Sequence, residues 1–148
     1  MARLIESSLW VDFTRSKSPL ALKTLIQPWI LDPLACLCEP IAFEVLRHAT
    51  PQEQKWIKAQ FETLPLLPTP DHLWRDATRL GQQCRSAGFN AGSLDLIIAA
   101  LCIYHDAELI TFDADYLSIA RSSKLRVHRI LQNSLSDLDF AEEVSKFK

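Results

Sequence analysis

The chain has 148 residues, of which 48% are apolar, a size and balance that suit one domain with a hydrophobic core. Charged residues make up 23% and the net charge is -2, so no overall basic field marks a nucleic-acid partner. Arg3 and Glu6 interrupt any signal-peptide start, and no apolar run approaches the ~20 residues of a membrane helix, so we expect a cytoplasmic protein with no membrane contact.

The first half of the chain predicts strands that alternate with helices. The first strand ends at Glu6, where Ser7 and Ser8 offer a helix cap. By apolar spacing we predict strands and helices in the order strand 3–5, helix 9–13, helix 19–30, strand 34–38, helix 41–49, helix 51–61 and strand 64–67. Pro65 and Pro68 restrict the last of these strands to a sheet edge.

The second half continues the alternation. It predicts a helix over 71–87, a loop containing Gly88 and Gly92, a buried helix over 94–104, a strand over 108–111, a helix over 115–121 and a strand over 125–130. The fold class is therefore α/β, with a mostly parallel sheet covered by helices on both faces. We expect one domain over residues 1–131. The tail over 132–148 is expected to pack on that domain or to extend from it as a loosely attached helix.

The cysteines predict no disulfide framework. Their spacing matches neither a CxxC pair nor a zinc site, so we expect buried, reduced thiols at Cys36, Cys38, Cys84 and Cys102.

Acidic residues stand at the edges of the predicted elements. Glu6 ends the first strand, Glu44 lies among apolar residues of a helix, Asp95 begins the buried helix, and Asp113 and Asp115 follow a later strand. In parallel sheets ligands collect beyond the carboxyl ends of the strands. Acids that converge there indicate a divalent-metal site and phosphodiester chemistry. Without a cation, such crowded carboxylates should have raised pKa values.

Each acid also has a simpler explanation when it is taken alone. Glu6 can be a surface residue at a strand end, and Glu44 can pair with a cation one turn along its helix. Asp95 can complement the helix dipole, while Asp113 and Asp115 can cap the turn before the next helix. The set as a whole carries more weight than any member.

Four segments in order resemble the motifs of the PIN domain family. They are LIESSLWVDF at 4–13, EVLRHA at 44–49, DLIIAA at 95–100 and TFDADY at 111–116. Within the family they are similar to the VapC-like toxins of bacterial and archaeal toxin–antitoxin pairs, and the resemblance runs from Leu4 to Ile130. The first motif departs from the family pattern, because Glu6 stands where an aspartate is usual.

The resemblance implies a three-layer α/β/α PIN-like fold and a Mg²⁺- or Mn²⁺-dependent endoribonuclease. It further implies an RNA substrate, a cognate antitoxin and a homodimer. By this resemblance the catalytic residues are Glu6, Glu44, Asp95 and Asp113, and the metal ligands are Glu6, Asp95, Asp113 and Asp115. Ser8 and Thr111 match positions that support the ligands.

RNA also requires cationic side chains outside the metal site. The candidates are Arg15, Lys17 and Arg47, with Lys23, Arg121 and Lys124 as further ones. Any one of them has solvated surface charge as the simpler explanation.

Two other functions compete with an active ribonuclease. Glutamate is one methylene longer than aspartate, and metal sites need ligands within ~0.5 Å of the productive geometry, so Glu6 also fits a PIN-fold binding or regulatory protein with weak or lost catalysis. A phosphatase or receiver domain is the third reading. A haloacid phosphatase needs Asp-x-Asp after the first strand, where this chain has Glu6-Ser7-Ser8, and no receiver-type aspartate and lysine pair stands out.

Overall fold

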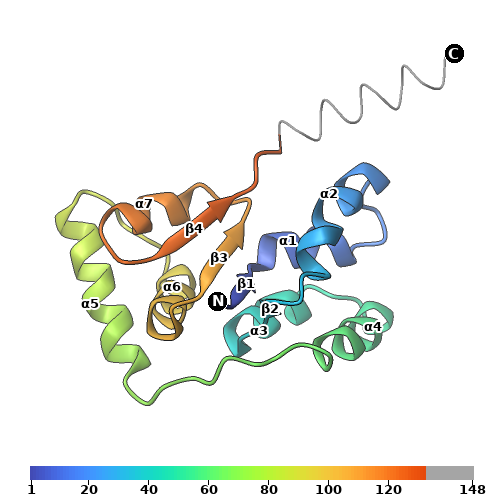
Figure 1. Ribbon diagram of the computed structural model, residues 1–148, viewed down its shortest axis with the longest axis horizontal. Coiled ribbons are helices and arrows are strands. Elements are labelled where there is room, and N and C mark those ends of the chain that lie inside the picture. Colours follow the sequence, from blue (N-terminus) through green and yellow to red (C-terminus); the bar gives the residue numbers. More distant parts are fainter. Residues whose placement is uncertain (133–148) are drawn as a thin grey trace, which may run out of the picture.

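The computed structural model describes residues 1–132, and most of the predicted tail, from residue 133 on, lies outside the described residues. A sheet of four parallel strands forms the centre (Figure 1), with the strand order β2-β1-β3-β4. The strands are β1 (Arg3–Ile5), β2 (Ala35–Cys36), β3 (Glu108–Thr111) and β4 (Arg126–Arg129).

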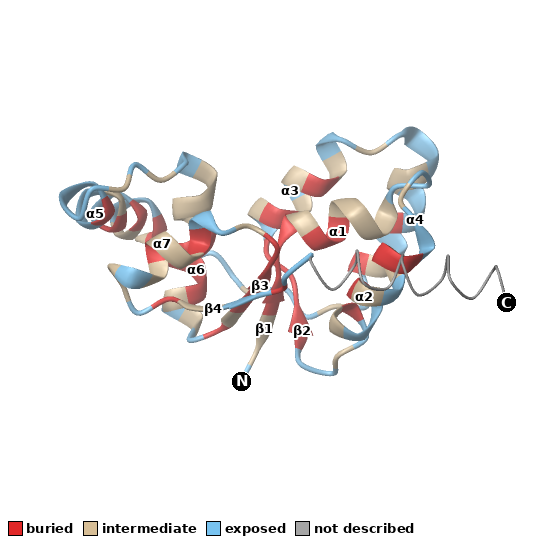
Figure 2. Ribbon diagram, turned by 90° about the horizontal axis from the view of Figure 1, so that it is seen from above, coloured by how far each residue is buried: buried red, intermediate tan, exposed pale blue. Residues whose placement is uncertain are grey.

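Helices cover both faces of this sheet. Seen from above in Figure 2, α5, α6 and α7 lie on one side of the strands and α1, α2 and α4 on the other, while α3 contacts both α1 and α6. The predicted α/β/α fold with a parallel sheet is confirmed. The helices are α1 (Ser7–Thr14), α2 (Leu20–Ile30), α3 (Glu39–Arg47), α4 (Pro51–Phe61), α5 (Leu73–Ser86), α6 (Ser93–His105) and α7 (Asp115–Arg121).

The core is formed by the central strands and by α6. Leu4 and Ile5 of β1 are fully buried, because β1 is flanked by strands on both edges and by helices on both faces. In α6, five consecutive residues from Ile98 to Cys102 are buried, which no amphipathic surface helix would allow. The prediction that this helix is buried on most sides is therefore confirmed, and burial of α6 fixes the position of its first turn.

The predicted strand over 64–67 is wrong as a strand. It is reduced to one bridge between Leu66 and Leu37 beside β2. The Pro65 carbonyl accepts from the Leu37 amide at 2.9 Å, and the Leu67 amide donates to the Leu37 carbonyl at 2.8 Å. Proline has no amide hydrogen, so Pro65 and Pro68 cannot extend the ladder, and the edge position expected for this segment holds.

The four cysteines are buried and free, as predicted. Burial raises the pKa of the Cys36 thiol to about 11 and that of Cys38 to about 12, so both are protonated and unreactive at neutral pH. None of the helices within residues 1–132 has the length and apolar character needed to cross a membrane.

Helix α4 begins with a capping box at Thr50. The Thr50 hydroxyl accepts from the Glu53 amide at 3.2 Å, and Glu53 Oε1 accepts from the Thr50 amide at 2.8 Å. Thr50→Ala is expected to lower the free energy of unfolding by about 1 kcal/mol, measured by urea denaturation, because the Glu53 amide loses its acceptor. Thr24→Ala removes the same atoms from an exposed position inside α2 and is expected to change stability by less than ~0.5 kcal/mol. Equal losses in the two variants would contradict the capping role.

Candidate metal centre

The parallel strands bring the predicted acids to one edge of the sheet. Glu6 directly follows β1, and Asp113 lies two residues after β3, the strand that pairs with β1. Helix α6 begins at Ser93, so Asp95 stands in its first turn. Segments from three parts of the sequence therefore meet beyond the carboxyl ends of neighbouring strands, where α/β folds bind ligands.

Three aspartates form a cluster that fits a divalent cation. One carboxylate oxygen each from Asp95, Asp113 and Asp115 lies within 4.8 Å of the others. Asp95 and Asp113 are half-buried and Asp115 is exposed, so the cluster opens to solvent on one side. Mg²⁺ and Mn²⁺ prefer oxygen ligands, and Mg²⁺ keeps several waters, which an open three-carboxylate site allows.

Hydrogen bonds hold these aspartates in place. The Asp113 amide donates to Thr111 Oγ1, and the Asp115 amide donates to Asp113 Oδ1, both at 2.9 Å. The buried Tyr116 hydroxyl donates to Asp95 Oδ1 at 3.0 Å and so joins α7 to α6. Tyr116 was part of a recognised motif, but nothing in the sequence assigned it this contact.

Glu6 lies beside the cluster without being one of its members. Its side chain is 4% exposed and caps α1. Glu6 Oε2 accepts from the Ser8 amide at 2.6 Å, and Oε1 accepts from the Thr111 hydroxyl at 2.7 Å. The structure thus brings three of the four predicted metal ligands close to one another. The fourth, Glu6, accepts hydrogen bonds from Ser8 and Thr111 instead.

Burial and mutual repulsion change the acidity of this region. Burial raises the pKa of Glu6 to about 7, against the hydrogen bonds from Thr111 and Ser8, and the charge of Glu44 adds to the rise. Burial also raises the pKa of Asp95, with further contributions from the charges of Asp113 and other neighbouring acids. The pKa values of these two acids are raised as expected, but burial is a larger cause than the crowding of carboxylates on which the expectation was based. A bound cation would favour their charged forms.

An acidic cleft of about 310 Å³ contains four of the predicted acids. Its lining residues are Glu6, Ser7, Ser8, Val11, Asp12, Arg15, Glu44, His48, Asp95 and Asp113. Asp12 and His48 were not predicted as site residues. Helical spacing was the available signal, because Ser8, Asp12 and Arg15 share one face of α1, and Glu44 and His48 are one turn apart.

The predicted RNA contacts are divided between the cleft and the outer surface. Arg15 lines the cleft. Lys17 and Arg47 are exposed and lie outside its lining, although Arg47 Nε donates to His48 Nε2 at 3.1 Å. Arg15 thus brings a cationic group to the cleft, and His48 brings a ring whose Nε2 already accepts from Arg47.

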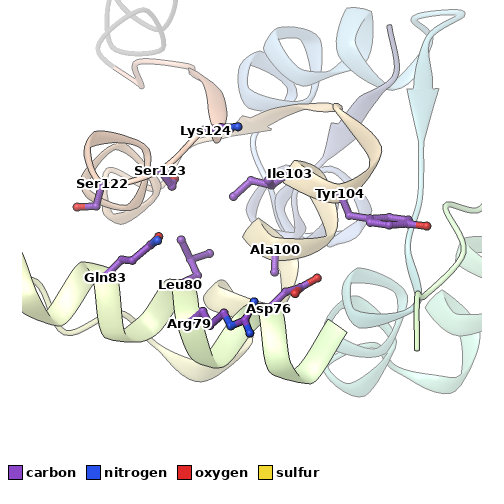
Figure 3. Close-up of a pocket in the computed structure, with 10 residues that line it drawn as sticks. All are labelled: Asp76, Arg79, Leu80, Gln83, Ala100, Ile103, Tyr104, Ser122, Ser123 and Lys124. Carbon is purple, nitrogen blue, oxygen red and sulfur yellow. The ribbon is translucent and has the colours of Figure 1, made fainter. Parts of the chain in front are cut away.

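A larger cavity, of about 460 Å³, lies between α5, α6 and the segment after α7. Figure 3 shows Leu80 and Ile103 pointing into it, with Lys124 at its rim. Asp76 is the one acid among the lining residues of this cavity, so the cavity has no cluster of carboxylates of the kind that holds Mg²⁺ or Mn²⁺. The candidate metal site is therefore at the smaller, acidic cleft.

Comparison with known proteins agrees with this geometry. A family model described as "PIN domain" matches residues 3–122. A VapC ribonuclease of Mycobacterium bovis and Ribonuclease VapC11 of Mycobacterium tuberculosis are each 32% identical over 128 residues, which covers 83% of this chain and 95% of the relative. VapBC2 from Rickettsia felis, solved with a DNA fragment from its promoter, superposes with a TM-score of 0.70 at 16% identity, over 88% of this chain and 99% of the matched chain. DNA-bound VapBC from Salmonella typhimurium gives 0.68 at 11% identity, over 87% and 98%.

Proposed function

The chain belongs to the PIN domain family, and we propose that it is a Mg²⁺- or Mn²⁺-dependent endoribonuclease that acts as the toxin of a toxin–antitoxin pair. One observation carries the proposal. Asp95, Asp113 and Asp115 converge at the carboxyl edge of the sheet, and Asp95 and Asp113 line a cleft together with Glu44.

Four acids of the site have roles in this proposal. The three aspartates hold the cation, and Glu44 orients or deprotonates the attacking water. A cation held by these residues would supply Lewis-acid chemistry, by lowering the pKa of a bound water and stabilising negative charge on a phosphate. Ser8 and Thr111 hold the backbone of the site through hydrogen bonds to the Phe112 and Asp113 amides.

Binding of RNA would use side chains in and around the cleft. Arg15 and His48 are among the residues that line it and can contact phosphates that flank the scissile bond. Arg47 can assist through its hydrogen bond to His48, and Lys17 is available on the exposed segment after α1. Such contacts would position the RNA backbone without recognising the base sequence.

The proposed protein partners are a cognate antitoxin and a second copy of the chain. Several matched structures are VapBC or FitAB assemblies, which supports the antitoxin. Phe43 and Trp74 are 60% and 66% exposed, and both line an apolar groove between α3, α5 and α6. Large exposed apolar side chains beside a groove are typical of protein interfaces.

A second candidate function is a PIN-fold binding or regulatory protein with little catalysis. The observation that favours it is the placement of Glu6, whose two carboxylate oxygens accept internal hydrogen bonds. If the cation requires a fourth carboxylate ligand, Glu6 does not supply it in this arrangement, because its oxygens lie outside the three-aspartate cluster.

An RNA cleavage assay separates the two candidates. We expect the unchanged chain to cleave single-stranded or structured RNA with Mg²⁺ or Mn²⁺ and to be inactive with EDTA. Glu6→Asp is the comparison, because it restores the residue usual in the family. Cleavage only by the aspartate form would support the binding protein, and no cleavage by either folded protein would rule out the nuclease.

A further inference from the structure

We infer that Glu6 is a positioning residue, not a metal ligand, and that it acts on Asp113 and Asp115 through the hydroxyl of Thr111. This inference rests on the proposed function, since it assigns how the proposed cation site is held together. It also gives the unusual glutamate a role that leaves the ribonuclease intact.

The first argument is that the carboxylate of Glu6 is already engaged. Its two oxygens accept from the Ser8 amide and from the Thr111 hydroxyl, at 2.6 and 2.7 Å. The side chain is 4% exposed, and its oxygens are absent from the set within 4.8 Å that the three aspartates form. To reach a cation in that set, the carboxylate would have to move away from the buried Thr111 hydroxyl and the partly buried Ser8 amide, and a buried donor left unpaired costs about 1–3 kcal/mol.

The second argument concerns the direction of the Thr111 hydroxyl. A hydroxyl has one proton, and Thr111 donates it to Glu6, so its lone pairs are turned to the Asp113 amide at 2.9 Å. Asp113 in turn accepts from the Asp115 amide at 2.9 Å. A single series of directed hydrogen bonds therefore runs from Glu6 to two members of the cluster.

The third argument is that water cannot replace Glu6 in this series. Thr111 is fully buried, so its hydroxyl has no access to solvent. A second connection, from the Phe112 amide to Ser8 Oγ at 3.2 Å, joins the same loop to α1. Aspartate at position 6 would have one methylene less with which to meet both the Ser8 amide and the Thr111 hydroxyl.

A double-mutant cycle on Mn²⁺ affinity, measured by titration calorimetry with the metal alone, tests the inference. Glu6→Gln keeps the size of the side chain but has one strong acceptor for two donors, and Thr111→Val removes the hydroxyl. We expect each single change to weaken binding by about 10- to 100-fold, as for other residues that support ligands. The double variant should be within ~3-fold of the weaker single variant, because both changes break one series of contacts.

A direct ligand would behave differently. If Glu6 bound the cation, its loss would weaken binding by the same factor with or without the Thr111 hydroxyl, and the two effects would multiply. That result would overturn the inference while leaving the proposed function in place. No Mn²⁺ binding by the unchanged protein would overturn the proposed function and the inference with it.

Two further measurements keep the test independent of metal loading and of misfolding. Thr111→Ser retains the hydroxyl and should bind Mn²⁺ within ~3-fold of the unchanged protein. In the metal-free state, Glu6→Gln should shift the amide resonances of Asp113 and Asp115, although Glu6 contacts neither backbone. Unchanged resonances in a folded Glu6→Gln protein would overturn the positioning role.

Discussion

Asp95→Asn is expected to lower metal-dependent RNA cleavage by at least ~100-fold, which corresponds to about 2.7 kcal/mol of transition-state stabilisation. Asparagine has nearly the same shape, and its Oδ1 can still accept from the Tyr116 hydroxyl that now lies 3.0 Å from Asp95. The change therefore removes one charge from the three-aspartate cluster and little else. Cleavage kinetics and Mn²⁺ affinity should both report the loss.

The control for this variant is Asp71→Asn, the same chemical change at an exposed turn outside the cleft lining. It should cleave RNA at the rate of the unchanged protein. A folded Asp95→Asn protein with full activity would show that Asp95 only complements the dipole of α6, the simpler explanation that the sequence left open.

The metal-free protein is expected to lose stability as the pH rises from about 4.5 to 7. The folded pKa of Glu6 is raised from 4.5 to about 7, so the folded state retains a proton that the unfolded chain releases. The associated stabilisation is fully present below pH 4.5 and is lost as the pH rises through the folded pKa. At ~1.4 kcal/mol for each pKa unit, the loss is roughly 3 kcal/mol. Urea denaturation in EDTA across this range measures it.

Glu6→Gln is the matched variant for this experiment, because an amide does not titrate. Its stability should fall less steeply with pH, with a remaining slope from Asp95, whose pKa is also raised by burial. Mg²⁺ should reduce the fall in the unchanged protein, since a bound cation favours ionised carboxylates. Equally steep profiles for the two proteins would contradict the titration of Glu6.

The strands were predictable wherever an apolar run had a clear boundary. β1 ends at Ile5 before a charged residue, and β3 was predicted with its observed bounds. The segment over 34–38 was predicted too long, because the strand has only two residues and Cys38 already precedes α3. Periodicity cannot reveal such limits, since they depend on which backbone groups find a partner in the neighbouring chain segment.

The residues that form the site were easier to predict from the sequence than the geometry in which they meet. The order of the motifs identified Asp95, Asp113 and Asp115, which the structure brings together. The bond between Glu6 and Thr111 joins residues 105 positions apart, and no local pattern encodes it. Burial, which raises the pKa of Glu6, is likewise a property of the assembled layers and not of the first motif.

The position of β1 in the middle of the sheet has a consequence for the order of synthesis. β1 is made before its neighbour β3, which starts more than 100 residues later at Glu108, and Asp115 comes later still. A nascent chain that ends before Asp115 therefore lacks part of the cation site, even when the helices before α7 have formed. Pairing across such long sequence separations is also slow. A protein of this topology acquires the site late in its production, when nearly all of the domain has been made.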